Sequence, residues 1–152
     1  MQVKEMMNKN PVCCLPDTSV REIAEMMVEH DCGSVPVVEN GETNKPLLGI
    51  VTDRDIVCRL VAAGKNPLDA VVKECMTTPA VQVTPQDSIE DAARIMEENQ
   101  IRRIPVVDDT GAVCGILTQA HIAKNSSKAR AGELLQSISK KTGTPSAVGA
   151  HR

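Results

Sequence analysis

The chain contains a direct internal repeat, and this repeat constrains the fold more than any other feature. The segment VKEMM at residues 3–7 recurs as VKECM at residues 72–76. The same offset relates PVV at residues 36–38 to PVV at residues 105–107. An ancient duplication explains matches that recur in the same order along the chain. Because domains of about 60 residues bury little surface and are only marginally stable in isolation, we expect the two copies to pack together.

Each copy has the same predicted order of elements, β-α-β-β-α. Ser19 and Ser88 are each followed three residues later by an acid, which is the spacing of a capping box at a helix N-terminus. Two β-branched strands joined by a Gly-containing turn follow in each copy. A second helix then begins at Thr52 or Thr118, and the first of these ends near Gly64. The sequence therefore predicts an α+β fold in which two sheets pack face to face with pseudo-twofold symmetry, creating two equivalent clefts.

The repeat also sets the expected domain boundaries. We expect the first copy to span residues 1–66 and the second to span residues 67–125. Residues 126–152 lie outside the repeat, and we expect a short helix around 129–139 followed by a disordered tail.

Composition excludes several classes of function. The 152 residues include no Phe, Tyr or Trp, so base stacking on an aromatic platform is ruled out and the core must consist of aliphatic and sulfur-containing side chains. A net charge of −3 gives no electrostatic footprint for nucleic acid. No apolar stretch is long enough to span a membrane, and the N-terminus has no signal-peptide pattern. We therefore expect a cytoplasmic protein whose six cysteines are mostly reduced.

The repeated motifs resemble a known family. Met7 to Pro11, the segments SVPVVE and RIPVVD, and the frames GIVT and GILT are similar to the cystathionine-β-synthase (CBS) domain. The chain resembles a tandem CBS pair, or Bateman module, and the TDRDI frame followed by AAGKNP is similar to small stand-alone CBS-pair proteins of the bacterial hypoxic-response type. This resemblance implies regulatory binding of adenosyl ligands (AMP, ADP, ATP, S-adenosylmethionine or NAD). It also implies a homodimer that acts on an unknown protein partner, with no required cofactor and no catalysis.

The resemblance assigns a ribose-binding role to the Thr-x-x-Asp motif, Thr52 to Asp55. An ionised carboxylate can accept hydrogen bonds from both hydroxyls of a ribose. The same two residues also have the spacing of a helix capping box, and the two roles are compatible. The family further implies that first-strand residues, here Val12 and Cys13, surround the adenine.

The second copy departs from the motif, because Thr118 is followed by His121 where the first copy has an acid. Imidazole cannot accept from a diol as a carboxylate does, so we expect this site to be weaker, differently selective or empty. His121 is otherwise interpreted as a solvated helix residue, with a pH sensor or a metal ligand as alternatives.

The arginines that precede PVV in the second copy are the phosphate candidates. Guanidinium groups of Arg102 and Arg103 match phosphate oxygens bidentately, and the family's geometry directs them to the site of Asp55. A surface charge pair is the alternative interpretation. Ser34 is the uncharged residue at the equivalent place in the first copy.

No pattern of nucleophile and base, and no zinc-ligand spacing, occurs in the sequence, so we expect neither an enzyme nor a metal site. Four of the six cysteines align with apolar residues of the other copy, which predicts that they are buried as small hydrophobic side chains. Two alternatives to nucleotide sensing stay open: a ligand-free stress or scaffold protein with redox-responsive Cys13 and Cys14, and an accessory protein that acts on a metal.

Overall fold

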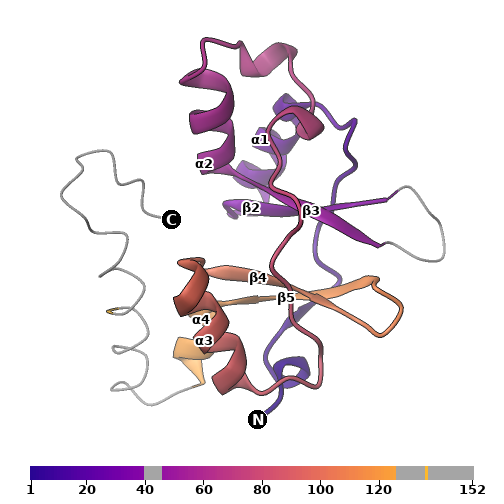
Figure 1. The fold of residues 1–152 in the computed structure, drawn as a ribbon, viewed down its shortest axis with the longest axis vertical. Coiled ribbons are helices and arrows are strands. Elements are labelled where there is room, and N and C mark those ends of the chain that lie inside the picture. Colours follow the sequence, from indigo (N-terminus) through magenta and orange to yellow (C-terminus); the bar gives the residue numbers. More distant parts are fainter. Residues whose placement is uncertain (40–45, 126–135, 137–152) are drawn as a thin grey trace. The chain divides into compact units, whose positions relative to one another are not determined.

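The computed structural model describes residues 1–39, 46–125 and 136 (Figure 1). Part of the predicted turn at 40–46, and the predicted C-terminal helix and tail apart from residue 136, lie outside the described residues. Contacts divide the chain into two compact units. Unit 1 combines Met1–Asn10, Val81–Asp108 and the described residues from Cys114 onwards, whereas unit 2 combines Pro11–Ala80 with Asp109–Val113. Both units contain helices and strands, which confirms the predicted α+β class.

Unit 2 is built on an antiparallel pair of strands, β2 (Ser34–Val38) and β3 (Leu47–Thr52). Helices α1 (Val20–Glu29) and α2 (Asp53–Ile56) lie on the same side of this pair in Figure 1. As predicted, the Ser19 hydroxyl caps α1 by accepting a hydrogen bond from the backbone N–H of Glu22 at 3.1 Å. A π-helical turn (Val57–Val61) prolongs α2, and the chain leaves the helical conformation at Gly64, where φ is +78°.

Unit 1 contains a three-stranded sheet in the order β1 (Asn8–Lys9), β5 (Val113–Thr118), β4 (Arg103–Val107). Helices α3 (Ile89–Asn99) and α4 (Gln119–Lys124) lie together beside this sheet in Figure 1. The Ser88 hydroxyl caps α3 through the backbone N–H of Asp91 at 3.0 Å, again as predicted. Each repeat therefore supplies one helix–strand–strand–helix body.

The opening segments of the two repeats are exchanged between the units. Val3 is fully buried in the core of unit 1, and its N–H donates to the carbonyl of Asp87 at 2.9 Å. Val72 is fully buried in the core of unit 2, and its N–H donates to the carbonyl of Thr18 at 2.9 Å. The boundaries 1–66 and 67–125 follow the duplicated sequence, whereas each compact unit contains the start of the other copy.

Aliphatic and sulfur-containing side chains form both cores. In unit 2 the buried set includes Cys14, Val20, Ile23, Val35, Val37, Val51, Leu60 and Cys75, and in unit 1 it includes Val3, Val83, Ile89, Met96, Ile104, Val106, Leu117 and Ile122. Cys32 and Cys114 pack at the edges of these cores, and Cys13 is half-buried. Of the four cysteines predicted to be buried from their apolar counterparts, Cys75 is buried, whereas Cys13, Cys32 and Cys114 are only half-buried. Only one of the adjacent pair lies in the core, as alternation predicts, but it is Cys14 and not Cys13. No helix within the described ranges has both the length and the apolar character needed to cross a bilayer.

Candidate functional site

The Thr52–Asp55 motif forms a reciprocal cap at the start of α2. The Thr52 hydroxyl accepts a hydrogen bond from the Asp55 N–H at 3.1 Å, and Asp55 Oδ2 accepts one from the Thr52 N–H at 3.0 Å. Both N–H groups would otherwise lack partners at the helix end. The predicted capping role of Thr52 is therefore confirmed, and Asp55 shares it. Only one carboxylate oxygen takes part, so the carboxylate keeps capacity for further donors.

The Asp55 carboxylate is buried and has a second polar neighbour. The residue is 7% exposed, which is rare for an acid unless it is well hydrogen-bonded. The hydroxyl of Thr77 lies 3.3 Å from Asp55 Oδ1 and 3.4 Å from Oδ2. Two backbone hydrogen bonds with Ile50, of 3.0 and 2.8 Å, hold Thr77 against β3. Sequence reasoning missed Thr77, because it lies 22 residues from Asp55 and at the start of the other repeat.

Ser34 carries a buried hydroxyl beside this cap. It begins β2 directly opposite Thr52, and it is 7% exposed. Its Oγ has no hydrogen-bond partner among the residues that the structure describes. The preceding residue, Gly33, accepts a hydrogen bond from the Asp53 N–H at 3.0 Å, which fixes the start of β2 against the start of α2. Because buried polar groups are nearly always paired, the Ser34 hydroxyl is a candidate hydrogen-bonding group of this site.

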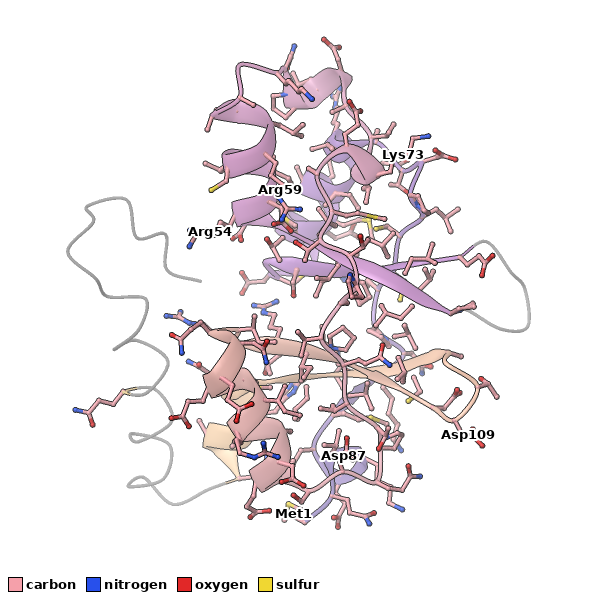
Figure 2. All side chains as sticks on the ribbon, in the orientation of Figure 1. Met1, Arg54, Arg59, Lys73, Asp87 and Asp109 are labelled. Carbon is pink, nitrogen blue, oxygen red and sulfur yellow. The ribbon has the colours of Figure 1, made fainter. Side chains whose placement is uncertain are left out.

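Arg59 brings a positive charge to the same part of unit 2. It extends from the π-helical turn after α2, and its Nη1 donates to the carbonyls of Cys75 and Met76 at 3.1 and 2.7 Å (Figure 2). Burial and the nearby Asp55 charge raise the pKa of the Cys75 thiol, and Arg59 partly offsets this rise. Arg59 and Thr77 thus attach the 75–77 segment to the α2 region at two successive points.

Val12 and Cys13 complete the predicted set in unit 2, although the structure has no strand at these positions, only an isolated bridge at the next residue. Val12 and Cys13 are half-buried, and the following residue, Cys14, bridges to Val37 of β2 in parallel. Unit 2 therefore contains Val12, Cys13, Ser34, Thr52 and Asp55.

Unit 1 repeats the cap with different chemistry. The Thr118 hydroxyl accepts from the His121 N–H at 3.1 Å, and His121 Nδ1 accepts from the Thr118 N–H at 3.2 Å. An accepting Nδ1 requires the neutral imidazole with its proton on Nε2. Burial, Lys124 and Arg103 all lower the pKa of His121, which favours that neutral form. His121 lies in a helix, as expected, but it is only partly exposed, and its ring takes the place in the cap that the Asp55 carboxylate has in the first copy.

The two arginines lie at the start of β4 in unit 1. The Arg102 carbonyl accepts from the Gln119 N–H at 2.8 Å, which repeats the Gly33–Asp53 contact of unit 2. Arg103 occupies the position equivalent to Ser34 and contributes to the positive potential at His121. Asp55 of unit 2 thus corresponds to the neutral His121 of unit 1, and the uncharged Gly33 and Ser34 correspond to Arg102 and Arg103, so the two halves are chemically unequal.

No cluster of three or more His, Cys, Asp or Glu side chains suited to a metal ion occurs in residues 1–39 and 46–125. The cysteines of the described ranges are all free thiols. Burial, reinforced by Cys13 and Cys75, raises the pKa of the Cys14 thiol to about 12. Cys14 is therefore protonated at neutral pH, which makes it a poor nucleophile.

Comparison with known proteins matches each of the two sequence repeats separately. The model of the CBS domain family matches residues 3–62 and again residues 72–128. The chain belongs to the CBS domain family. It is 38% identical over 138 residues to the CBS domain-containing protein YhcV of Bacillus subtilis, which covers 90% of this chain and 94% of that protein. It is 35% identical over 122 residues to hypoxic response protein 1 of Mycobacterium tuberculosis, which covers 80% of this chain and 82% of that protein. The predicted resemblance to this family is therefore confirmed.

Solved CBS structures include complexes with adenosyl ligands. CBSX2 in complex with AMP has a TM-score of 0.70 and 30% identity, over 85% of this chain and 98% of that chain. The CBS pair of MJ0100 with 5′-methylthioadenosine and S-adenosylmethionine has a TM-score of 0.72 and 28% identity, over 82% of this chain and 98% of that chain. The hexameric CBS-CP12 protein of bloom-forming cyanobacteria has a TM-score of 0.72 and 31% identity, over 86% of this chain and 73% of that chain.

Proposed function

We propose that this CBS protein is a regulatory sensor that binds an adenine nucleotide through Asp55 and performs no chemistry on it. The observation that carries the proposal is the buried Asp55 carboxylate, which retains acceptor capacity after capping α2. The unpaired Ser34 hydroxyl beside it supports a bound polar ligand. The AMP and S-adenosylmethionine complexes of related CBS proteins support an adenosyl compound as that ligand.

Each proposed ligand contact follows from side-chain chemistry. Asp55 accepts hydrogen bonds from the two ribose hydroxyls, as acidic residues do in dinucleotide-binding folds. Thr52 holds Asp55 in place through the reciprocal cap. Val12 and Cys13 offer an apolar edge for the adenine, and Ser34 supplies a hydrogen-bonding hydroxyl.

Arg102 and Arg103 are proposed to contact the phosphates of the nucleotide. Their planar guanidinium groups form bidentate hydrogen bonds with phosphate oxygens. The phosphate groups of AMP, ADP and ATP carry different negative charges. The double variant Arg102→Ala/Arg103→Ala is therefore expected to weaken the binding of ATP more than the binding of adenosine. Equal weakening of both ligands would contradict the phosphate role.

The Thr-x-x-His motif of the second copy, Thr118 to His121, is proposed to bind the same ligand weakly or not at all. Nδ1 of His121 already accepts the Thr118 N–H, and the other ring nitrogen of the neutral imidazole is a donor. The ring therefore offers no acceptor for a ribose diol. One nucleotide per chain is the expected stoichiometry.

Regulation is proposed to follow from differential binding. A ligand that prefers one conformation or assembly of the protein shifts the population toward it and thereby changes contacts with a protein partner. We propose a cytoplasmic homodimer as the working assembly. The high pKa of Cys14 gives the redox-responsive alternative little support, because disulfide exchange requires a thiolate.

Isothermal titration calorimetry with AMP, ADP, ATP, S-adenosylmethionine and NADH tests the proposal directly. The informative variant is Asp55→Asn, which keeps an acceptor for the Thr52 N–H but removes the charge and one acceptor oxygen. Loss of a charged hydrogen-bonding partner is expected to weaken binding by about 10-fold or more. The matched control is His121→Asn, which changes the equivalent cap of unit 1 and is expected to leave affinity within about twofold. Failure of all five compounds to bind at millimolar concentration would refute the nucleotide proposal.

A further inference from the structure

The contact between Thr77 and Asp55 has a consequence for how a ligand reaches the carboxylate. We propose, building on the nucleotide function proposed above, that the Thr77 hydroxyl blocks the diol-binding edge of Asp55 and must turn away when a ribose binds. Thr77 is then an access-controlling residue of the ligand site. The proposal assigns a role to a residue that lies outside the Thr-x-x-Asp motif.

The distances place the Thr77 hydroxyl on the edge that a ribose needs. It lies at nearly equal distances, 3.3 and 3.4 Å, from the two oxygens of the Asp55 carboxylate. A vicinal diol that donates one hydrogen bond to each oxygen approaches the carboxylate along this same edge. Two donors cannot occupy one edge together, so the ribose and the Thr77 hydroxyl compete.

The internal contact is weak enough to be displaced. Hydroxyl-to-carboxylate hydrogen bonds are typically about 2.5–2.7 Å long, and the Thr77 contact is longer to both oxygens and shared between them. The Asp55 carboxylate meanwhile keeps its 3.0 Å hydrogen bond from Thr52, which lies on Oδ2 and is part of the helix cap. A ligand therefore exchanges only the weaker of the two contacts.

The backbone of Thr77 cannot move away easily. Its N–H and C=O both bond Ile50, and Gly49 of β3 lies so close that a methyl group there would overlap the Thr77 carbonyl oxygen. Arg59 holds the two preceding carbonyls, those of Cys75 and Met76. Rotation of the Thr77 side chain between its staggered positions is then the available motion.

This arrangement connects ligand binding to the end of unit 2. Thr77 lies three residues before Ala80, the last residue of unit 2 in this stretch of the chain. A ligand that turns the Thr77 side chain breaks its contact with Asp55, while the backbone hydrogen bonds of Thr77 with Ile50 stay in place. The site thereby acquires a local two-state element, which regulation by population shift requires.

The test compares Thr77→Ala with the wild-type full-length protein, using AMP and 2′-deoxy-AMP as ligands in calorimetry. Removal of the competing hydroxyl is expected to tighten AMP binding about 2- to 10-fold, the equivalent of one hydrogen bond. This gain in affinity must be restricted to AMP, because 2′-deoxy-AMP lacks the vicinal diol that would bind the two Asp55 oxygens uncovered in Thr77→Ala. Thr78→Ala is the matched control, and its affinity for both ligands is expected to equal that of the wild type.

A second measurement needs no variant. In wild-type protein labelled at the threonine methyl groups, three-bond couplings report the χ1 angle of Thr77, and saturation with AMP is expected to change its rotamer. An unchanged rotamer, or AMP affinity that is unchanged or weaker in Thr77→Ala, would overturn the access role while leaving the Asp55 site intact. If AMP binds wild type and Asp55→Asn equally, or binds neither, the proposed function fails and the access role fails with it.

Discussion

Gly49 and Gly115 occupy equivalent positions in the two repeats, yet the structure predicts different costs for an added methyl group. At Gly49 an added Cβ lies closest to the backbone carbonyl oxygen of Thr77, and 2.8 Å from Thr78 Cγ2. At Gly115 the nearest atom is Met7 Sδ at 2.6 Å, near the end of a flexible side chain, and the nearest backbone atom is Asn8 O at 3.0 Å. We therefore expect Gly49→Ala to destabilise the protein more than Gly115→Ala.

The magnitude follows from the contacts that must move. An added methyl at Gly49 separates Thr77 from β3 and disrupts its two backbone hydrogen bonds with Ile50, at a cost of about 2 kcal/mol in total. Residual overpacking adds about 1–3 kcal/mol. The lower chain entropy of Ala in the unfolded state offsets about 0.4–1 kcal/mol. The net expectation for Gly49→Ala is a loss of about 2–5 kcal/mol in the free energy of unfolding.

Urea denaturation followed by circular dichroism measures this difference. For Gly115→Ala the Met7 side chain can rotate away and the Asn8 carbonyl must give by only a few tenths of an ångström, so we expect a loss of about 1 kcal/mol. Gly49→Ala should also alter nucleotide affinity, because it displaces Thr77 from Asp55. The reasoning is refuted if Gly49→Ala is as stable as the wild type, or if Gly115→Ala costs as much.

Three further predictions concern individual side chains. The pKa of His121 in the folded protein lies below its ordinary value of 6.5, so its cap stabilises the protein fully above that pH and weakens as the pH falls. We therefore expect the melting temperature to drop between about pH 7.5 and pH 5, and His121→Asp to reduce that drop. An undiminished drop in the variant would contradict this assignment. Ser34→Ala removes a buried hydroxyl that has no hydrogen-bond partner in the described residues, so the unfolding free energy of the ligand-free variant should be unchanged or higher by up to about 1 kcal/mol. The variant should bind AMP more weakly than the wild type. A large loss of stability would show that Ser34 has a protein partner. Cys14, with its pKa raised to about 12, should resist alkylation of the native protein while the exposed Cys58 reacts, which peptide mass spectrometry can resolve; equal labelling would mean that Cys14 is accessible.

Local features of the site were predictable because their hydrogen bonds join residues three positions apart. Ser19, Ser88, Thr52 and Thr118 all cap helices where the sequence places them. A cap needs only a short polar side chain and the free N–H groups of the first turn, so spacing alone identifies it. The role of His121 did not follow from spacing, since the capping-box pattern calls for a carboxylate or amide side chain at this position, whereas here a neutral imidazole nitrogen accepts the hydrogen bond.

Contacts between distant parts of the chain were not predictable in the same way. The contact of Thr77 with Asp55 depends on how the second copy's opening segment pairs with β3. The burial of Ser34 depends on what covers the start of β2, and residue spacing carries no information on either point. The exchange of Val3 and Val72 between units left no trace in the repeat, because both copies exchange the same segment and the sequence offset stays constant.

The sequence by itself determined that this chain is a duplicated α+β protein of the CBS family, with one Thr-x-x-Asp and one Thr-x-x-His motif. Periodicity, caps and turn residues act over a few positions, and the repeat shows them twice. Tertiary structure alone decided which segments share a core and which side chains meet at Asp55. It did so because burial and long-range hydrogen bonding depend on chain packing, and a residue such as Thr77 acquires its partner only when two distant segments are brought together.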